Sequence, residues 1–333
     1  MTTTTARPPT TAKIVIAFAI VYVVWGSTYL AIRFAVETIP PFLMAGVRFL
    51  IAGGILYTLT QWRSPQRLGA RAWIEATING SLMLGLANGL LCWAEKTVPS
   101  GLAALSIATV PLWMVLLNWT MFAGPRPTAR IVLGLLVGLA GVAALVGPSR
   151  IGDASVNPWG AAALMGSCLF WSIGSLRSRR DTRATSAFLQ TAMQMIGGGA
   201  FLMVFSAVVG DYGRAADSVI SWKSLFGMAY LVVLGSIVGL SSYIWLLRVC
   251  PPAKVATYAY VNPIVAVLLG NLFAGEALTS RSLLAAGLII PAVVLVTLER
   301  RAPRSTEAEP VAEPRALIPP GRSCRPIITG EST

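Results

Sequence analysis

Long apolar runs alternate with short polar segments along almost the whole chain. Each run holds about 20 residues, the length that an α-helix needs to cross the hydrocarbon core of a bilayer. The pattern therefore predicts an all-α integral membrane protein. Its ten transmembrane helices are expected at 14–35, 42–61, 73–94, 101–122, 131–147, 159–176, 186–209, 222–247, 253–274 and 282–298. No cleavage pattern follows the first run, so we interpret it as a retained helix and not as a signal peptide.

Two parts of the chain resemble each other at a shift of 152 residues, at which Trp93 meets Trp245, Pro99 meets Pro251 and Pro111 meets Pro263. Because each half has five helices, an odd number, the halves are expected to enter the membrane in opposite orientations. Such an inverted repeat is common among transporters. The predicted organisation is a polar cytoplasmic tail at 1–13, a first repeat at 14–148, a linker at 149–157, a second repeat at 158–298 and a disordered cytoplasmic tail at 299–333.

The basic residues predict the orientation. If the N-terminus is cytoplasmic, 19 of the 26 Lys and Arg residues fall in inside loops or tails, five fall in outside loops, and Arg33 and Arg48 lie within helices. Cytoplasmic loops of membrane proteins carry an excess of Lys and Arg. We therefore expect a multi-pass protein of the inner cell membrane with both termini in the cytoplasm.

Composition supports a lipid environment and removes other classes. Only 12% of the residues are charged, about half of what a soluble domain carries. The net charge of +13 comes from residues in the gaps between apolar runs, so we expect the lipid bilayer and no nucleic acid as a partner. The chain has no histidine, and its four cysteines lack the spacing of a metal site or a disulfide framework. No metal and no other cofactor is expected.

Two prolines mark a candidate binding site. Pro111 and Pro263 are placed near the middle of the fourth and ninth predicted helices, where each would free a backbone carbonyl. Matching breaks near the bilayer midplane of two repeats point to a substrate site. The alternative is a pair of packing kinks.

Polar and aromatic residues at the same level are further candidates for lining a cavity. They are Trp25, Ser27, Asn88, Trp171, Tyr243, Tyr258 and Asn262. For each aromatic residue, packing or contact with lipid is an equally good interpretation.

Arg48 carries a charge inside the second predicted helix, at a cost of about 2.5–3.5 kcal/mol on insertion scales. Glu95 and Glu276 lie at outer helix ends. We expect Arg48 either to pair with one of these glutamates or to serve anion binding or gating. No carboxylate lies at the midplane, so the sequence does not indicate a buried acid that alternately binds protons.

Several motifs together resemble the EamA family of the drug/metabolite transporter superfamily. They are the segments at 24–29, 39–41, 45–49, 256–263 and 275–279. The resemblance implies ten-helix exporters with a substrate cavity between the halves, lined by helices one, three, four, six, eight and nine. Tyr29, in the first motif, joins the cavity candidates. The segment at 124–128 departs from the acidic stretch usual in the family, so an acid at that place is kept only as Glu276.

The sequence thus predicts a secondary transporter for small molecules, with export favoured by the resemblance. A membrane-embedded enzyme is an alternative, but the chain lacks the His residues, paired acids or metal clusters that such sites usually show. A channel is the other alternative. The sequence does not indicate which small molecule is carried.

Overall fold

The computed structural model describes residues 10–94, 106–146, 158–181, 186–274 and 280–297. These residues all belong to one compact unit, Met1–Glu299. All the regular elements among them are helices, so the predicted all-α class is confirmed. Most of the two predicted tails, the linker and both glutamates proposed as partners of Arg48 lie outside the described residues.

The helices follow the ten predicted apolar runs. Those of the first half are α1 (Thr11–Ala35), α2 (Pro41–Arg63), α3 (Ala70–Gly80), η1 (Ser81–Ala87), α4 (Asn88–Ala94), α6 (Val110–Thr120) and α7 (Ala129–Val146). Those of the second half are α9 (Pro158–Arg180), α10 (Ala187–Val208), α11 (Asp211–Ala216), α12 (Trp222–Tyr230), η2 (Leu231–Leu240), α13 (Ser241–Val249), α14 (Pro252–Val255), α15 (Tyr258–Ala274) and α16 (Ser280–Thr297). The described helices are consistent with ten crossings, and each predicted run contains at least one of them.

Local sequence signals explain where several helices begin. Pro41 is the first residue of α2, a position where the missing amide hydrogen of proline costs nothing. The Ser186 hydroxyl accepts hydrogen bonds from the amides of Phe188 and Leu189 and caps α10. The Ser221 hydroxyl accepts from the Ser224 amide at 3.1 Å and caps α12. The first amide groups of a helix have no partner within the helix. The two serines accept hydrogen bonds from such groups, and the proline has no amide hydrogen that needs a partner.

Two π-helical segments, η1 and η2, interrupt long α-helices at corresponding places in the two halves. η1 lies between α3 and α4, and η2 lies between α12 and α13. A π-helix has wider turns than an α-helix and is frequent at functional sites. Both segments contribute to the cavity described below.

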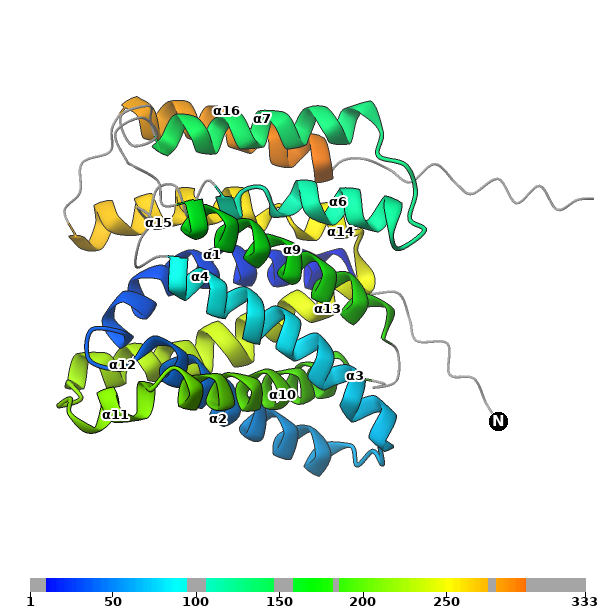
Figure 1. Ribbon diagram of the computed structural model, residues 1–333. Coiled ribbons are helices and arrows are strands. Elements are labelled where there is room, and N and C mark those ends of the chain that lie inside the picture. The colour runs from blue at the N-terminus through cyan, green and yellow to red at the C-terminus, as the bar shows by residue number, and fades with distance from the viewer. Residues whose placement is uncertain (1–9, 95–105, 147–157, 182–185, 275–279, 298–333) are drawn as a thin grey trace, which may run out of the picture. The chain divides into compact units, whose positions relative to one another are not determined.

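The two halves pack against each other in reciprocal pairs. α2 lies along α10, and α7 lies along α16 (Figure 1). α1 packs on η2 and α15 of the second half, while α9 packs on η1 and α6 of the first half. Each helix at the centre therefore contacts more than one element of the other half.

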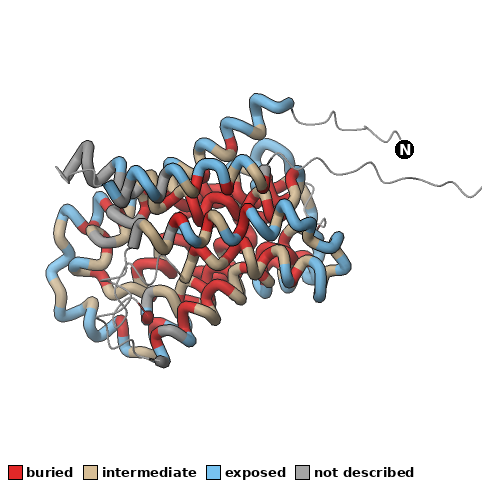
Figure 2. The backbone as a smooth tube through the Cα atoms, turned by 90° about the horizontal axis from the view of Figure 1, so that it is seen from above, coloured by how far each residue is buried: buried red, intermediate tan, exposed pale blue. Residues whose placement is uncertain are grey.

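Buried residues gather at the centre, and exposed residues lie on the outer faces of the helices (Figure 2). Many of the exposed residues are large and apolar. On α2, for example, Ile51, Ile55 and Leu59 form an exposed stripe with a period of four residues. Four described helical stretches are long and apolar enough to cross a membrane by themselves, namely Thr11–Thr28, Pro41–Arg63, Ala187–Val208 and Trp222–Val249. This surface suits a hydrocarbon solvent and not water.

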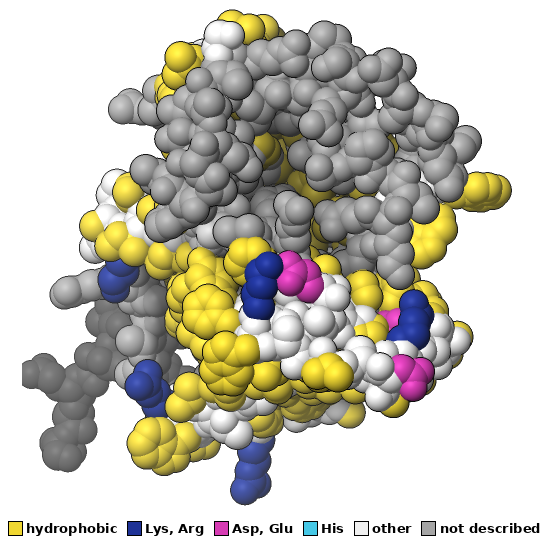
Figure 3. Space-filling view, turned by 90° about the vertical axis from the view of Figure 1, so that its left-hand side faces the viewer, with side chains coloured by type: hydrophobic (Ala, Val, Ile, Leu, Met, Phe, Trp, Pro, Cys, Tyr) yellow, Lys and Arg dark blue, Asp and Glu magenta, His cyan; other side chains and the backbone are white. Residues whose placement is uncertain are grey.

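A group of charged side chains lies at each end of the long stretch from α12 to α13. The basic end carries Arg177, Arg179 and Arg248. The opposite end carries Lys223 and Glu37, whose Nζ and Oε1 atoms lie 2.6 Å apart. In Figure 3, which views the opposite end, basic and acidic side chains lie side by side among hydrophobic ones.

Candidate substrate cavity

A cavity of about 140 Å³ lies at the contact between the two halves. Its lining residues come from α1, α2, η1, α4 and α6 of the first half and from α9, η2 and α15 of the second. They are Trp25, Thr28, Ile32, Arg48, Phe49, Leu84, Ala87, Asn88, Leu91, Ile107, Val110, Ser167, Cys168, Trp171, Gly235, Leu240, Tyr258 and Asn262. Most are apolar or aromatic and a few are polar, which is the usual composition of a small-molecule site.

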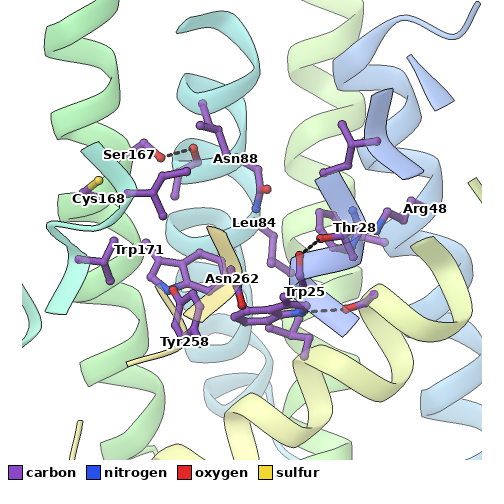
Figure 4. A pocket seen from close by; sticks show the side chains of 18 residues that line it. Trp25, Thr28, Arg48, Leu84, Asn88, Ser167, Cys168, Trp171, Tyr258 and Asn262 are labelled. Atoms are coloured by element: carbon purple, nitrogen blue, oxygen red, sulfur yellow. Dashed lines mark hydrogen bonds between the residues drawn. The ribbon is translucent and has the colours of Figure 1, made fainter. Parts of the chain in front are cut away.

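Arg48 enters the cavity from α2 and is held there by the second half. Its Nε donates to the Ser236 hydroxyl of η2 at 2.8 Å, and both residues are buried. Its guanidinium carbon lies 4.8 Å from the centre of the Phe49 ring. Figure 4 shows Arg48 and Thr28 across the cavity from Ser167, Cys168 and Trp171. The buried charge is therefore fixed at the cavity wall.

Four aromatic rings, those of Trp25, Trp171, Tyr243 and Tyr258, form what we call the ring cluster. Trp25 has its ring centre 5.7 Å from that of Trp171, 5.0 Å from Tyr243 and 4.9 Å from Tyr258. Three of the rings line the cavity, whereas the fully buried Tyr243 packs behind them. The cluster joins α1, α9, α13 and α15 into one floor.

Polar side chains in the cavity wall bind backbone groups that the irregular helices expose. The Trp25 Nε1 donates to the Gly235 carbonyl of η2 at 3.2 Å. The Asn88 amide donates to the Met83 carbonyl of η1 at 3.1 Å. The Asn262 amide, with its nitrogen toward two carbonyls, donates to Tyr22 at 3.2 Å and Tyr258 at 3.1 Å. Buried backbone carbonyls thus obtain the partners that a low-dielectric interior requires.

Beyond the ring cluster, towards the basic end, hydrogen bonds hold the helices together. The Tyr243 hydroxyl donates to Ser175 at 2.8 Å, and the Tyr22 and Thr257 hydroxyls lie 2.6 Å apart. These bonds join α13 to α9 and α1 to the segment between α14 and α15. Tyr243, Ser175 and Thr257 are fully buried. This side of the cluster is closed.

A partly buried polar network follows at the basic end. The Gln190 oxygen accepts two hydrogen bonds from Arg248, at 3.0 and 2.7 Å, and its nitrogen donates to the Ser178 carbonyl. Arg177 contacts the Glu75 carboxylate at 2.7 Å and donates to the Asn79 oxygen at 3.1 Å. The network therefore links α3, α9, α10 and α13.

A second hollow, of about 400 Å³, is larger but lacks polar chemistry. Its lining residues are Phe42, Gly85, Leu86, Gly89, Leu90, Trp93, Phe201, Phe205 and Val209. Because a specific site needs polar groups that orient a ligand, we regard the smaller cavity as the candidate site. Among the residues that the structure describes, no three His, Cys, Asp or Glu side chains gather closely enough to hold a metal ion.

The structure brings together six of the residues selected from the sequence. Trp25, Arg48, Asn88, Trp171, Tyr258 and Asn262 all line the cavity. Tyr243 belongs to the ring cluster but does not line the cavity. Ser27 does not line the cavity. Its hydroxyl donates to the Val24 carbonyl and lies 2.6 Å from the Tyr230 hydroxyl. The Tyr29 side chain, Glu95 and Glu276 lie outside the described residues.

The two prolines differ in their setting. Pro263 lies inside α15, as the sequence predicts. Pro111 does not interrupt a continuous helix, because a turn at Ala108 and Thr109 precedes it and α6 begins only at Val110. Neither proline lines the cavity, but the neighbouring Val110 and Asn262 do. Each proline therefore directly follows a residue that lines the cavity.

Sequence reasoning missed several cavity residues, among them Thr28, Phe49, Ser167 and Cys168. Gly235 and Gly239 of η2 were not among the residues selected from the sequence either. A Cβ atom at Gly235 would lie 2.9 Å from Arg48 Nη2, and one at Gly239 would lie 2.6 Å from Trp25 Nε1. The spacing of these glycines in an apolar run was a signal of close approach, but it did not show which side chains approach.

Comparisons with known proteins agree with this architecture. The EamA-like transporter family matches the chain twice, over residues 12–147 and 158–298. The inner membrane transporter YedA of Escherichia coli (strain K12) is 39% identical over 83% of this chain and 88% of its own length. The transporter YvbV of Bacillus subtilis is 25% identical over 90% of this chain and 95% of its own. A solved crystal structure has the same fold, with a TM-score of 0.71 and 20% identity over 87% of this chain and 98% of its own.

Apolar helices and a central cavity shared by two halves are the features of a polytopic membrane protein with a candidate small-molecule site. The chain belongs to the EamA-like transporter family. The resemblance noted from its motifs is confirmed, and the protein is a membrane transporter. The family, YedA and YvbV carry the names of transporters and not of enzymes.

Proposed function

We propose that this transporter exports small molecules by alternating access between its two halves, which form an inverted repeat. The observation that carries the proposal is the position of the cavity. Both halves line it, and the ring cluster closes it on the side of the basic end. A site between two repeats is where rocking of one half against the other changes the side of access.

Reciprocal packing supports the inverted repeat. α1 packs on η2 and α15, and its counterpart α9 packs on η1 and α6. The π-helical segments also occur at corresponding places. The pairs α2–α10 and α7–α16 each join corresponding helices of the two halves, as an inverted repeat would produce.

The distribution of charge supports an orientation with the basic end in the cytoplasm. Arg177, Arg179 and Arg248 lie there with Glu75, and the opposite end holds the Lys223–Glu37 pair. In this orientation Ile32, Arg48 and Leu91 extend the cavity towards the outside. Export is the direction that the family resemblance favours.

Efflux of a metabolite panel tests the function. Cells that lack or overproduce the protein are loaded with the compounds, with and without a collapsed proton gradient, and efflux is followed. Ala87→Phe adds a ring to the cavity wall and should abolish saturable efflux at a normal membrane level, whereas Ala19→Phe on the exposed face of α1 should not. Equal efflux by the two variants would contradict the proposed path.

Thiol labelling tests the orientation. Cys324 lies in the tail that follows the described residues, and we predict that this tail is cytoplasmic. A membrane-impermeant thiol reagent should label Cys324 in broken cells but not in intact ones. Labelling at the same rate in intact cells would reverse the proposed orientation.

A further inference from the structure

The outer face of α2 carries an apolar stripe as long as one half of a bilayer is thick. Ile51, Ile55 and Leu59 are exposed one helical turn apart, and Trp62 follows them with an exposed fraction of 81%. From Ile51 to Trp62 the helix rises about 16 Å at 1.5 Å per residue, close to half of the ~30 Å hydrocarbon core. Tryptophan is enriched at the level of the lipid headgroups. The stripe therefore offers a surface for one acyl chain, with Trp62 at its polar end.

Three arginines follow directly after this stripe. Arg63 is the last residue of α2, Arg67 lies in the loop before α3, and Arg71 is the second residue of α3. All three are exposed, and no acidic residue separates them in the sequence. The next acidic residue along the chain, Glu75, binds Arg177 at 2.7 Å. The polar end of the stripe thus carries a local charge of +3.

Hydrogen bonds and packing fix the shape of the loop that displays these charges. The Gln61 side-chain amide donates to the Gln66 carbonyl at 2.9 Å and accepts from the Gln66 backbone amide at 2.8 Å. Leu68, Tyr57 and Trp73 pack on the buried contact between α3 and α10, and the rings of Tyr57 and Trp73 are 5.4 Å apart. The arginines therefore project from a fixed backbone, so less freedom is lost when they bind a ligand.

We propose that the stripe and the loop together bind one anionic phospholipid. Its phosphate contacts the guanidinium groups of Arg63, Arg67 and Arg71, and one of its acyl chains lies along the stripe. Arginine forks match phosphate oxygens, and basic clusters beside a transmembrane helix attract anionic lipids. A zwitterionic lipid fits less well, because its own cationic group faces the same three charges. The inference concerns the outer face of the transporter and goes beyond the proposed function.

Lipid binding to the purified full-length protein in detergent tests the site. Radiolabelled phosphatidylglycerol is the probe, and phosphatidylcholine with the same acyl chains is the competitor. Phosphatidylcholine should compete at least about tenfold more weakly, since three basic groups favour a net negative headgroup. Inorganic phosphate should displace the probe no better than chloride at the same ionic strength, because it has no chain to place on the stripe. Equal competition by the two lipids, or specific displacement by phosphate, would overturn the proposal.

A triple variant assigns the binding to the loop. Arg63→Gln combined with Arg67→Gln and Arg71→Gln should weaken phosphatidylglycerol binding by about tenfold or more. Phosphatidylglycerol with a photoreactive group near its headgroup should also cross-link to residues 61–73 of the natural protein. This second measurement needs no variant. Cross-links that avoid the segment 61–73 would overturn the assignment.

The matched control removes the same number of charges from exposed residues elsewhere on the predicted cytoplasmic side. It combines Lys13→Gln, Arg126→Gln and Arg130→Gln. Charges more than about 10 Å away are largely screened at about 0.1 M salt, so the control should bind phosphatidylglycerol nearly as the natural protein does. Equal losses in the two triple variants would show a general attraction to the basic side and would overturn the site.

Two single variants test the other parts of the site. Trp62→Ala should weaken phosphatidylglycerol several-fold, whereas Trp222→Ala, which removes an equally exposed ring at the opposite end, should not. Gln61→Ala keeps all three charges and loses the bonds that fix the loop, so it should also weaken binding. Natural binding in both Trp62→Ala and Gln61→Ala would overturn the proposed fit and leave a contact of charge alone.

Discussion

The two sides of the ring cluster differ in packing although α1 and α9 contribute to both. On one side lies a cavity of about 140 Å³ with Arg48 and Asn88 in its wall. On the other side Tyr243 and Met114 are fully buried, and hydrogen bonds connect α1, α9 and α13 to their neighbours. One side is hollow and the other is closed.

Under the proposed alternating access, this difference indicates which contacts a transport cycle would have to open. The Tyr243–Ser175 and Tyr22–Thr257 bonds connect helices at the closed side. A typical hydrogen bond contributes only about 0.5–1.5 kcal/mol net to stability. Contacts of this size can separate and form again during a cycle, whereas the loss of a large buried side chain costs several times more. The closed side thus combines a rigid ring cluster with polar contacts that can be exchanged.

The largest expected effect comes from Tyr243→Ala, which removes the fully buried ring of the cluster. We expect a loss of about 3–5 kcal/mol in the free energy of unfolding, the range for truncation of large buried aromatic residues. Chemical unfolding of the purified protein measures it. Tyr243→Phe keeps the ring and loses the hydroxyl contacts with Ser175 and the Met114 sulfur, of which the bond to Ser175 is the strong one, so it should cost about 0.5–1.5 kcal/mol. If both variants cost the same, the ring cluster is not what closes this side.

A smaller effect is expected from Gly239→Ala, which places a Cβ atom 2.6 Å from Trp25 Nε1. The indole must move and its hydrogen bond to Gly235 weakens, so we expect a cost of about 1–3 kcal/mol from overpacking. Unfolding in denaturant measures this cost. Gly287→Ala is the matched control, because no atom lies within 4 Å of its Cβ position in α16. It should be neutral or stabilising by up to about 1 kcal/mol, and a loss equal to that of Gly239→Ala would argue against the role of Trp25.

The last two variants concern the ion pairs at the two ends, and the exposed pair gives the smallest effect. Arg177→Gln should cost about 1–3 kcal/mol, because the fully buried Asn79 loses the donor to its oxygen. Lys223→Gln should cost about 0–1 kcal/mol, because the Lys223–Glu37 pair is exposed to solvent. The denaturation midpoints of the two variants, measured under the same conditions, show which ion pair contributes more to stability. A larger loss for Lys223→Gln would show that the opposite end is the more tightly held one.

Much of the candidate site could be predicted from the sequence because charge and amide groups are conspicuous in apolar runs. Arg48, Asn88 and Asn262 were selected for this reason, and all three line the cavity. Ser27 was selected on the same ground, yet the neighbouring Thr28 lines the cavity in its place. Successive residues of a helix point about 100° apart, so Ser27 and Thr28 face different neighbours. In a helix that is apolar all round, the sequence does not indicate which face turns towards the cavity.

The sequence alone determined the membrane class, the positions of the helices and the family, because about 20 apolar residues per crossing and the family motifs are local properties of the chain. The tertiary structure decided the rest. η1 and η2 adopt π-helical turns that no local signal indicated. Arg48 meets Ser236, 188 residues away in the sequence, and Trp25 meets Tyr243 and Tyr258. These contacts depend on how each helix is rotated and on which neighbour it packs against, and both are settled only when the two halves come together.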